Sequence, residues 1–316
     1  QQEYGGKKYF CTLSAGYAGY PEDGSNYLEL LKSANYSLEY SKMMGKNRMT
    51  VFSRDILADR ERRLELLELL RESVERGFAG FTIHYQPQVD TVSGRLCGAE
   101  ALARWHCTKY GDVSPGEFIP LMEQSGLIIP FGQWILSRGM AQCLEWCRFR
   151  PDFQISVNLS YIQLAQGDFI SFLRTALEEH SLAPSKIILE LTETYLAKAE
   201  EDTLRMIAQM KELGVKIAMD DFGVGYSSLF SLKSIPVDVV KIDRGFVKGI
   251  TSDLFNATFI RSITDLCHDV GRKVCLEGVE TEEEYEAVRE LGMEYIQGYY
   301  FGRPMSARQF EDRLKE

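Results

Sequence analysis

Short apolar runs that each end in a polar or charged residue recur along this chain and constrain its fold. The run Val215–Met219, interrupted by Lys216, is followed by two adjacent carboxylates, Asp220 and Asp221, and by the turn Gly223-Val-Gly225. Such a run is typical of a buried parallel strand. Because neighbouring aspartates repel each other unless a cation separates them, the sequence predicts a pair of divalent metal ions at this strand end.

The alternative is that the two aspartates only cap a helix and solvate a loop. The other runs argue against it, because they end in the same way at Glu100, Asn158, Glu190, Lys241, Glu277 and Gln297. From Asn158 to Gln297, with Asp220 included, the spacings are 32, 30, 21, 36 and 20 residues, which suits one strand and one helix per step. Active sites of β/α barrels lie at the carboxyl ends of the strands, so we expect an α/β fold with parallel strands that close into a TIM-like (β/α)8 barrel.

Length and composition set the remaining bounds. A chain of 316 residues with 45% hydrophobic content can bury one barrel-sized core and carry a smaller second piece. No apolar run approaches the roughly 20 residues that a membrane-spanning helix needs, and Gln1–Tyr4 does not resemble a signal peptide. The seven cysteines are scattered, which favours reduced thiols and a cytoplasmic protein with no membrane segment.

The net charge of -10 argues against a DNA-binding groove, because no basic stripe is present to replace counterions. A phosphate-containing substrate would therefore have to be bound through metals. The predicted site sets two cations, Lys241 and Arg104, against five carboxylates: Glu100, Glu190, Asp220, Asp221 and Glu277. Two divalent ions would bring that charge near balance.

The first 53 residues do not form a complete domain by themselves. Residues 8–16 and 47–52 favour strands, and residues 26–44 favour an amphipathic helix between them. This set exposes more apolar surface than it can bury. The stretch Thr12–Gly24, with Ser33-Ala34 and Ser41–Arg48, resembles the C-terminal third of a GGDEF (diguanylate cyclase) domain. The signature loop of that family is absent, so we infer no cyclase activity.

The sequence thus divides into three parts. Residues 1–53 are expected to be an α+β fragment of a degenerate or truncated GGDEF-like domain. Residues 54–77 show apolar positions at helical spacing and end at Gly77, which predicts a connector helix. Residues 78–316 are expected to form the barrel.

Motifs within the barrel resemble those of the EAL family, over about residues 66 to 306. They are Tyr85-Gln-Pro87, Glu100-Ala-Leu102 with Arg104-Trp105, Phe118–Pro120, Ser156–Ser160, Glu190–Glu193, Asp220–Gly223, Lys241–Asp243, Glu277–Glu280 and Gln297–Phe301. EAL domains are phosphodiesterases specific for cyclic di-GMP. The resemblance implies hydrolysis of cyclic di-GMP to linear pGpG.

The resemblance also implies a ligand set. Glu100, Asn158, Glu190 and Asp220 would hold a first Mg or Mn ion, and Asp220 would bridge to a second ion held by Asp221. Water between the two ions would attack phosphorus in line. Lys241 would orient that water. Glu277 would be either the general base or a ligand of the second metal, and both roles stay open.

Further roles follow from the same resemblance. Gln86, Arg104 and Gln297 would contact the dinucleotide, with Arg104 placed for a phosphate. Glu193 would anchor the loop 222–228, with Asp243 and Glu280 as supporting residues, and the protein would be a homodimer through this domain. Val224 stands where the family usually has Thr or a small residue, and Ala103 where it usually has Leu; neither is a predicted metal ligand.

Three alternatives remain. A catalytically weak or silent EAL domain would act as a cyclic di-GMP receptor or scaffold. A nicotinamide or flavin enzyme could use Gly223 and Gly225, but Ser228 replaces the third glycine, and the two aspartates would repel a pyrophosphate. An unrelated metal-dependent barrel enzyme of the enolising kind would also use carboxylates and a lysine at strand ends.

Overall fold

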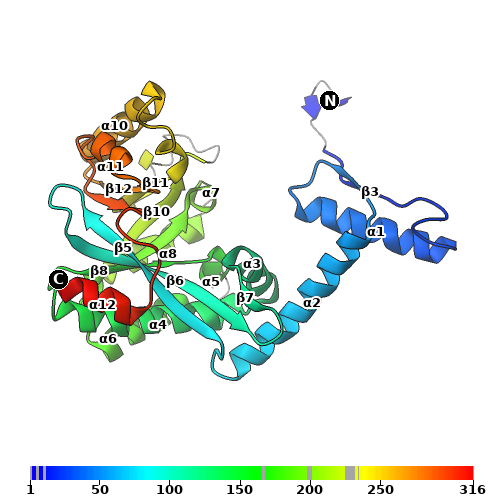
Figure 1. Ribbon diagram of the computed structural model, residues 1–316, viewed down its shortest axis with the longest axis horizontal. Helices are drawn as coiled ribbons and strands as arrows, with labels where there is room; N and C mark the ends of the chain where they lie inside the picture. The colour runs from blue at the N-terminus through cyan, green and yellow to red at the C-terminus, as the bar shows by residue number, and fades with distance from the viewer. Residues whose placement is uncertain are drawn as a thin grey trace. The chain divides into compact units, whose positions relative to one another are not determined.

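The chain is divided into two compact units, Gln1–Arg71 and Glu72–Glu316. The computed structural model describes residues 2–4, 7–9, 12–165, 168–197, 201–224, 232–233 and 235–315, and their elements are labelled in Figure 1. Helix α2 (Arg54–Glu75) begins in the first unit and ends in the second. Each unit is described by itself below.

The N-terminal unit contains a parallel strand pair joined by a helix. β3 (Ala15–Tyr17) pairs with β4 (Met49–Val51), and α1 (Tyr27–Met43) connects them. A Cβ on Gly16 would lie 2.0 Å from the Ala34 carbonyl oxygen, so only glycine lets the helix cross the strand this closely. The expected single strand over 8–16 is wrong: β2 (Lys7–Tyr9) pairs with β1 (Gln2–Tyr4), and β3 begins only where β4 offers a partner.

The second unit is the predicted TIM-like barrel of eight strands. The strands lie in the order β5, β13, β12, β11, β10, β9, β8 and β6, and pairing between β6 and β5 closes the ring. Their bounds are β5 Phe81–Asp90, β6 Leu96–Cys107, β8 Gln154–Asn158, β9 Ile187–Thr192, β10 Lys216–Phe222, β11 Val239–Ile242, β12 Lys273–Glu277 and β13 Tyr295–Gln297. A short strand, β7 (Gly111–Val113), pairs antiparallel with the end of β6 outside the ring.

One strand departs from the expected all-parallel arrangement. β5 is antiparallel to both of its neighbours, β6 and β13, whereas the other pairs in the ring are parallel. Only a short turn over residues 91–95 joins β5 to β6, and the Asp90 amide donates to the Arg95 carbonyl across it at 2.9 Å. A parallel connection needs a crossover of a dozen or more residues, so this turn makes a hairpin.

Helices cover the outside of the barrel (Figure 1). They are α3 Pro115–Ser125, α4 Ile128–Cys147, α5 Tyr161–Ala165, α6 Phe169–His180, α7 Glu193–Leu196, α8 Glu201–Glu212, α10 Leu254–Asp269, α11 Glu282–Val288 and α12 Ala307–Lys315, with 3-10 turns η1 Pro184–Lys186 and η2 Arg244–Phe246. None of the helices in the described residues could span a membrane.

Alternation along each strand separates core from lumen. On β11, the fully buried Val240 and Ile242 flank Lys241, whose side chain lies inside the ring. Because successive side chains of a strand point to opposite faces, Val240 and Ile242 pack outward while Lys241 points inward. Below Lys241 the lumen is filled by the apolar cluster Ile188, Ala218, Val239 and Cys275. The fold therefore gathers polar side chains from separate strands in one lumen.

Candidate active site

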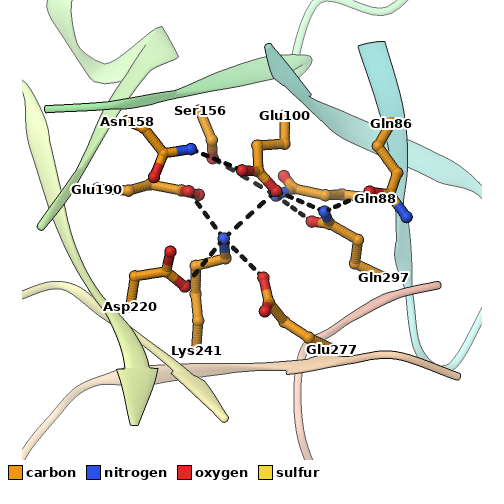
Figure 2. Close-up of polar contacts among 10 residues, drawn as sticks. All are labelled: Gln86, Gln88, Glu100, Ser156, Asn158, Glu190, Asp220, Lys241, Glu277 and Gln297. Atoms are coloured by element: carbon orange, nitrogen blue, oxygen red, sulfur yellow. Dashed lines mark hydrogen bonds and ion pairs between the residues drawn. The ribbon is translucent and has the colours of Figure 1, made fainter. Parts of the chain in front are cut away.

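Lys241 lies at the centre of the polar cluster (Figure 2). Its side chain is buried, and Nζ lies 2.7 Å from Glu190 Oε2, 2.7 Å from Glu277 Oε1, 3.2 Å from Asp220 Oδ1 and 3.5 Å from Glu100 Oε2. These four carboxylates come from strands β6, β9, β10 and β12. The single positive charge of Lys241 is too small to balance the negative charge of the four carboxylates around it.

Strand register brings the other predicted residues to the same place. Gln86 is paired with Glu100, Asn158 with Glu190, and Glu277 with Gln297 on neighbouring strands. The Asn158 amide donates to Glu100 Oε1 at 2.7 Å. The barrel therefore groups residues that lie up to about 200 positions apart in sequence.

The two adjacent aspartates reach one point because the strand is irregular there. The pairing of β10 with β11 shifts between Met219 and Phe222, and Asp221 has a φ of 57°. A regular strand would send the two side chains to opposite faces. With the left-handed residue, one oxygen each of Asp220, Asp221 and Glu277 lies within 4.8 Å of the others. Residues other than glycine that adopt a left-handed conformation often belong to functional sites.

Burial and charge shift the proton affinities within this cluster. Burial raises the pKa of Glu277 to about 7, and the neighbouring ammonium of Lys241 only partly opposes it. Burial also raises the pKa of Glu190 well above its ordinary value. For Glu100 burial acts in the same direction, but Lys241 and the amides of Gln297 and Asn158 together lower its pKa. The cluster thus lacks positive charge.

The donor set fits divalent cations. Carboxylate and amide oxygens are the ligands that Mg and Mn prefer. Glu190 Oε1 is buried without a hydrogen-bond partner among the described residues, although a buried carboxylate oxygen normally has one. A cation bound beside Glu190 would satisfy that oxygen and reduce the repulsion around Lys241.

A chain of amides completes the lumen. Gln297 Nε2 donates to Glu100 Oε2 at 2.6 Å and to Gln86 Oε1 at 3.2 Å, while Gln297 Oε1 accepts from Gln88 Nε2 at 2.9 Å. Gln88 also lies 3.5 Å from Ser156 Oγ. Gln88 and Ser156 were not among the predicted site residues, although they lie two residues from Gln86 and Asn158. The two-residue period of a strand could have identified both as lumen residues.

Arg104 shares the strand face of Glu100 on β6, and the charge of Glu100 together with Tyr299 partly offsets the fall in its pKa that burial causes. It lines a neighbouring, mostly apolar pocket together with Ile119, Phe131 and Asn158. The pocket above the carboxylates is lined instead by Gln86, Glu100, Asp220, Glu277, Glu280 and Gln297, with Arg244 and Tyr299, which the sequence analysis did not select. Leu102 borders both pockets, so they adjoin.

Three supporting residues were predicted around the loop after β10. The buried Glu193 accepts a hydrogen bond from the Gly223 amide at 2.8 Å, which fixes the start of that loop. Asp243 caps η2 by accepting from the Gly245 amide at 2.8 Å. The Glu280 side chain is exposed at the rim of the site pocket. Val224 is exposed, and the rest of the predicted loop, 225–228, lies outside the described residues.

Comparisons of this chain with family models and with curated proteins agree on one family. The model of the EAL domain matches residues 68–304. The bifunctional diguanylate cyclase/cyclic di-GMP phosphodiesterase MucR of Pseudomonas aeruginosa is 39% identical over 299 residues, covering 94% of this chain and 43% of MucR. The cyclic di-GMP phosphodiesterase PdeR of Escherichia coli is 33% identical over 305 residues, covering 96% and 45%. This chain therefore spans less than half the length of these curated relatives.

Solved structures resemble the same part of the chain. A structure described as PaMucR phosphodiesterase in complex with c-di-GMP is 40% identical, with a TM-score of 0.72, and the match covers 78% of this chain and 99% of that one. A structure of the EAL domain protein from Listeria monocytogenes is 31% identical, with a TM-score of 0.67, covering 80% and 97%.

Proposed function

The chain belongs to the EAL domain family, and from this premise we propose that it hydrolyses cyclic di-GMP to linear 5'-pGpG with Mg or Mn. The observation that supports this most is the group of four carboxylates from four strands around the buried Lys241. The relatives MucR and PdeR are named for cyclic di-GMP phosphodiesterase activity. The substrate fits an acidic chain that must bind phosphate through cations.

The proposed ligands divide between two ions. Glu100, Asn158, Glu190 and Asp220 would hold the first, and Asp220 and Asp221 the second. When bound, such ions lower the pKa of water and stabilise charge that develops on phosphate oxygens. Asp221 is exposed at the strand end, where its left-handed conformation keeps its carboxylate next to that of Asp220.

The remaining residues would prepare the reaction around the ions. Lys241 holds Glu277 at 2.7 Å and limits the repulsion between the carboxylates. A carboxyl with a pKa of about 7 suits a general base at neutral pH, so Glu277 is assigned the role of taking the proton from the attacking water. Gln86 and Gln297 would contact the dinucleotide from the site pocket, and Arg104 would reach a phosphate from the adjoining one.

The N-terminal unit is proposed to be the end of a GGDEF-like domain. The alignment with MucR covers 94% of this chain and so extends beyond the EAL match into the first 71 residues. MucR is also named as a diguanylate cyclase. The proposal for this part concerns its fold alone.

Compartment and assembly complete the proposal. Six cysteines of the described chain are free, which supports a reducing compartment such as the cytoplasm. The protein is expected to be a homodimer through the barrel unit. Light scattering should therefore give the mass of two chains, and a mass of one chain would contradict it.

The central experiment measures turnover of cyclic di-GMP by the purified chain with Mn, with Mg and with EDTA, with separation of products by anion exchange. We expect pGpG with either metal and none with EDTA. Metal-loaded protein that leaves the dinucleotide intact would contradict the proposal, and tight binding without turnover would assign the chain as a receptor instead.

A further inference from the structure

Gln88 is a buried residue of the barrel lumen with no role in the reaction proposed above. It lies on β5, directly opposite Gln297 of β13. Its Nε2 donates to Gln297 Oε1 at 2.9 Å, and Gln297 Nε2 in turn donates to Glu100 Oε2 at 2.6 Å (Figure 2). Two hydrogen bonds, with Gln297 between them, therefore connect Gln88 to a proposed metal ligand.

The donor-to-acceptor direction of these two hydrogen bonds matters for Glu100. The oxygen and the NH2 group of a glutamine amide are nearly equal in size, so hydrogen-bond partners rather than packing decide how the amide is turned. A carboxylate only accepts hydrogen bonds, so Gln297 must present its NH2 group to Glu100. Its oxygen then points to Gln88, which donates to it. Without that donor, a buried amide oxygen would lose its partner.

The surroundings of Gln88 leave its orientation to hydrogen bonds. Gly98 is its partner on β6, and a Cβ there would lie 2.9 Å from Gln88 Oε1, so the glycine leaves space for the amide. A cavity of about 20 Å³ lies beside Gln88, Ser156 and Lys241, so packing around the amide is not complete. The bond to Gln297 and the longer contact with Ser156 Oγ therefore fix its direction.

We propose that Gln88 is a positioning residue for the metal centre. By donating to Gln297, it holds the NH2 group of Gln297 against Glu100, and Glu100 is held in turn with one oxygen toward Asn158. Loss of the Gln88 donor leaves the Gln297 oxygen without its partner, and only the acceptors Glu100 and Gln86 then hold the NH2 group in place, so Glu100 binds a divalent ion less well. The inference rests on the proposed function, because it requires Glu100 to be a metal ligand.

The test is calorimetric titration of the full chain with MnCl2, which measures metal binding without turnover. Gln88→Met keeps the size of the side chain and removes the donor. We expect it to weaken Mn binding by roughly 10-fold, as is typical when a partner of a metal ligand is lost. The matched control is Gln154→Met, because Gln154 lines the same cavity but donates to the Ser185 carbonyl at 2.7 Å. That control should bind Mn like the wild type.

Two further variants separate positioning from general damage. In a Gln297→Met background, Gln88→Met should have no further effect on Mn binding, because it acts only through Gln297. Gln88→Glu should weaken Mn binding at least as much as Gln88→Met. A carboxylate cannot donate a hydrogen bond to the Gln297 oxygen, and it attracts the NH2 group of Gln297 away from Glu100. Circular dichroism melting identifies any variant that fails to fold. If one of Gln88→Met and Gln88→Glu does not fold, Mn binding by the other tests the role of Gln88.

The outcomes distinguish two failures. Wild-type protein that binds Mn, with folded Gln88→Met and Gln88→Glu binding equally well, overturns the role of Gln88 alone. The same conclusion follows if the Gln88→Met effect persists undiminished in the Gln297→Met background. Wild-type protein that binds no Mn overturns the proposed function and the positioning role together.

Discussion

A single ammonium group holds four carboxylates together in this protein. Lys241 contacts Glu100, Glu190, Asp220 and Glu277, and the combined field of these carboxylates raises its pKa although burial alone would lower it. The lysine is thus kept charged where an isolated buried lysine would lose its proton. At the residue scale, the site is organised by this charge.

Replacing this lysine tests that organisation. We expect Lys241→Met to lower the free energy of unfolding in EDTA by about 3–5 kcal/mol, because removal of one partner leaves buried charges uncompensated. Mn or Mg should restore part of the loss by supplying positive charge. Urea unfolding with and without metal measures both effects. Lys211→Met, which breaks the more exposed pair with Asp238, should cost only about 1 kcal/mol or less. Equal losses in the two variants would contradict this account.

Glu277 predicts how stability depends on pH. Its ordinary pKa of 4.5 is raised to about 7 by burial in the folded chain. Between these values the folded state binds more protons than the unfolded state, so stability falls as pH rises from 4.5 to 7, by about 3 kcal/mol for this group. Urea unfolding of metal-free protein at several pH values measures the slope.

Glu277→Gln provides the control, because glutamine does not titrate. The variant should have a flatter dependence over the same pH range, and the difference between the two curves should be largest near neutral pH. Curves that run parallel from pH 4.5 to 7 would show that Glu277 does not carry the raised pKa.

At the scale of elements, the site depends on where strands end and turn. β12 and β13 bring Glu277 and Gln297 side by side, and the amides of Gly278 and Val279 donate to the Gln297 carbonyl at 2.8 and 3.3 Å. A Cβ on Gly298 would lie 2.0 Å from the Val279 carbonyl oxygen. The close approach of these two strand ends therefore requires glycine.

Gly298→Ala should separate the two strand ends. Because the clash is with backbone, we expect a loss of about 1–3 kcal/mol of stability, together with weaker Mn binding. Thermal melting and calorimetric titration measure the two effects. Gly116→Ala is the control, since a Cβ there meets only Ser114 Oγ, at 3.7 Å. If Gly298→Ala behaves like Gly116→Ala, the strand ends do not need this contact.

At the scale of the whole molecule, two compact units share one chain, and the proposed metal ligands all belong to the second. A cation that binds only the folded barrel unit stabilises that unit by mass action, by about 2.7 kcal/mol at a concentration 100 times its dissociation constant. Scanning calorimetry should therefore show that Mn shifts the melting of the barrel unit to higher temperature. A barrel transition that Mn leaves unchanged would contradict this.

Local pattern was enough to predict much of this protein. The apolar runs that end in polar residues, and the spacing of those ends, predicted the barrel that the structure confirms, because run length and the chain length between strands are local properties. The same pattern selected Glu100, Glu190, Asp220, Lys241 and Glu277, which the structure brings together. Their catalytic roles stay predictions.

The remaining features could not be predicted, because they depend on which strands pair when the ring closes. The short turn after β5 makes that strand antiparallel, contrary to the expectation of parallel strands throughout. The left-handed conformation of Asp221 and the pairing of Gln88 with Gln297 follow from register between strands far apart in sequence. Side-chain contacts across a closed barrel are long-range, and no local sequence pattern encodes them.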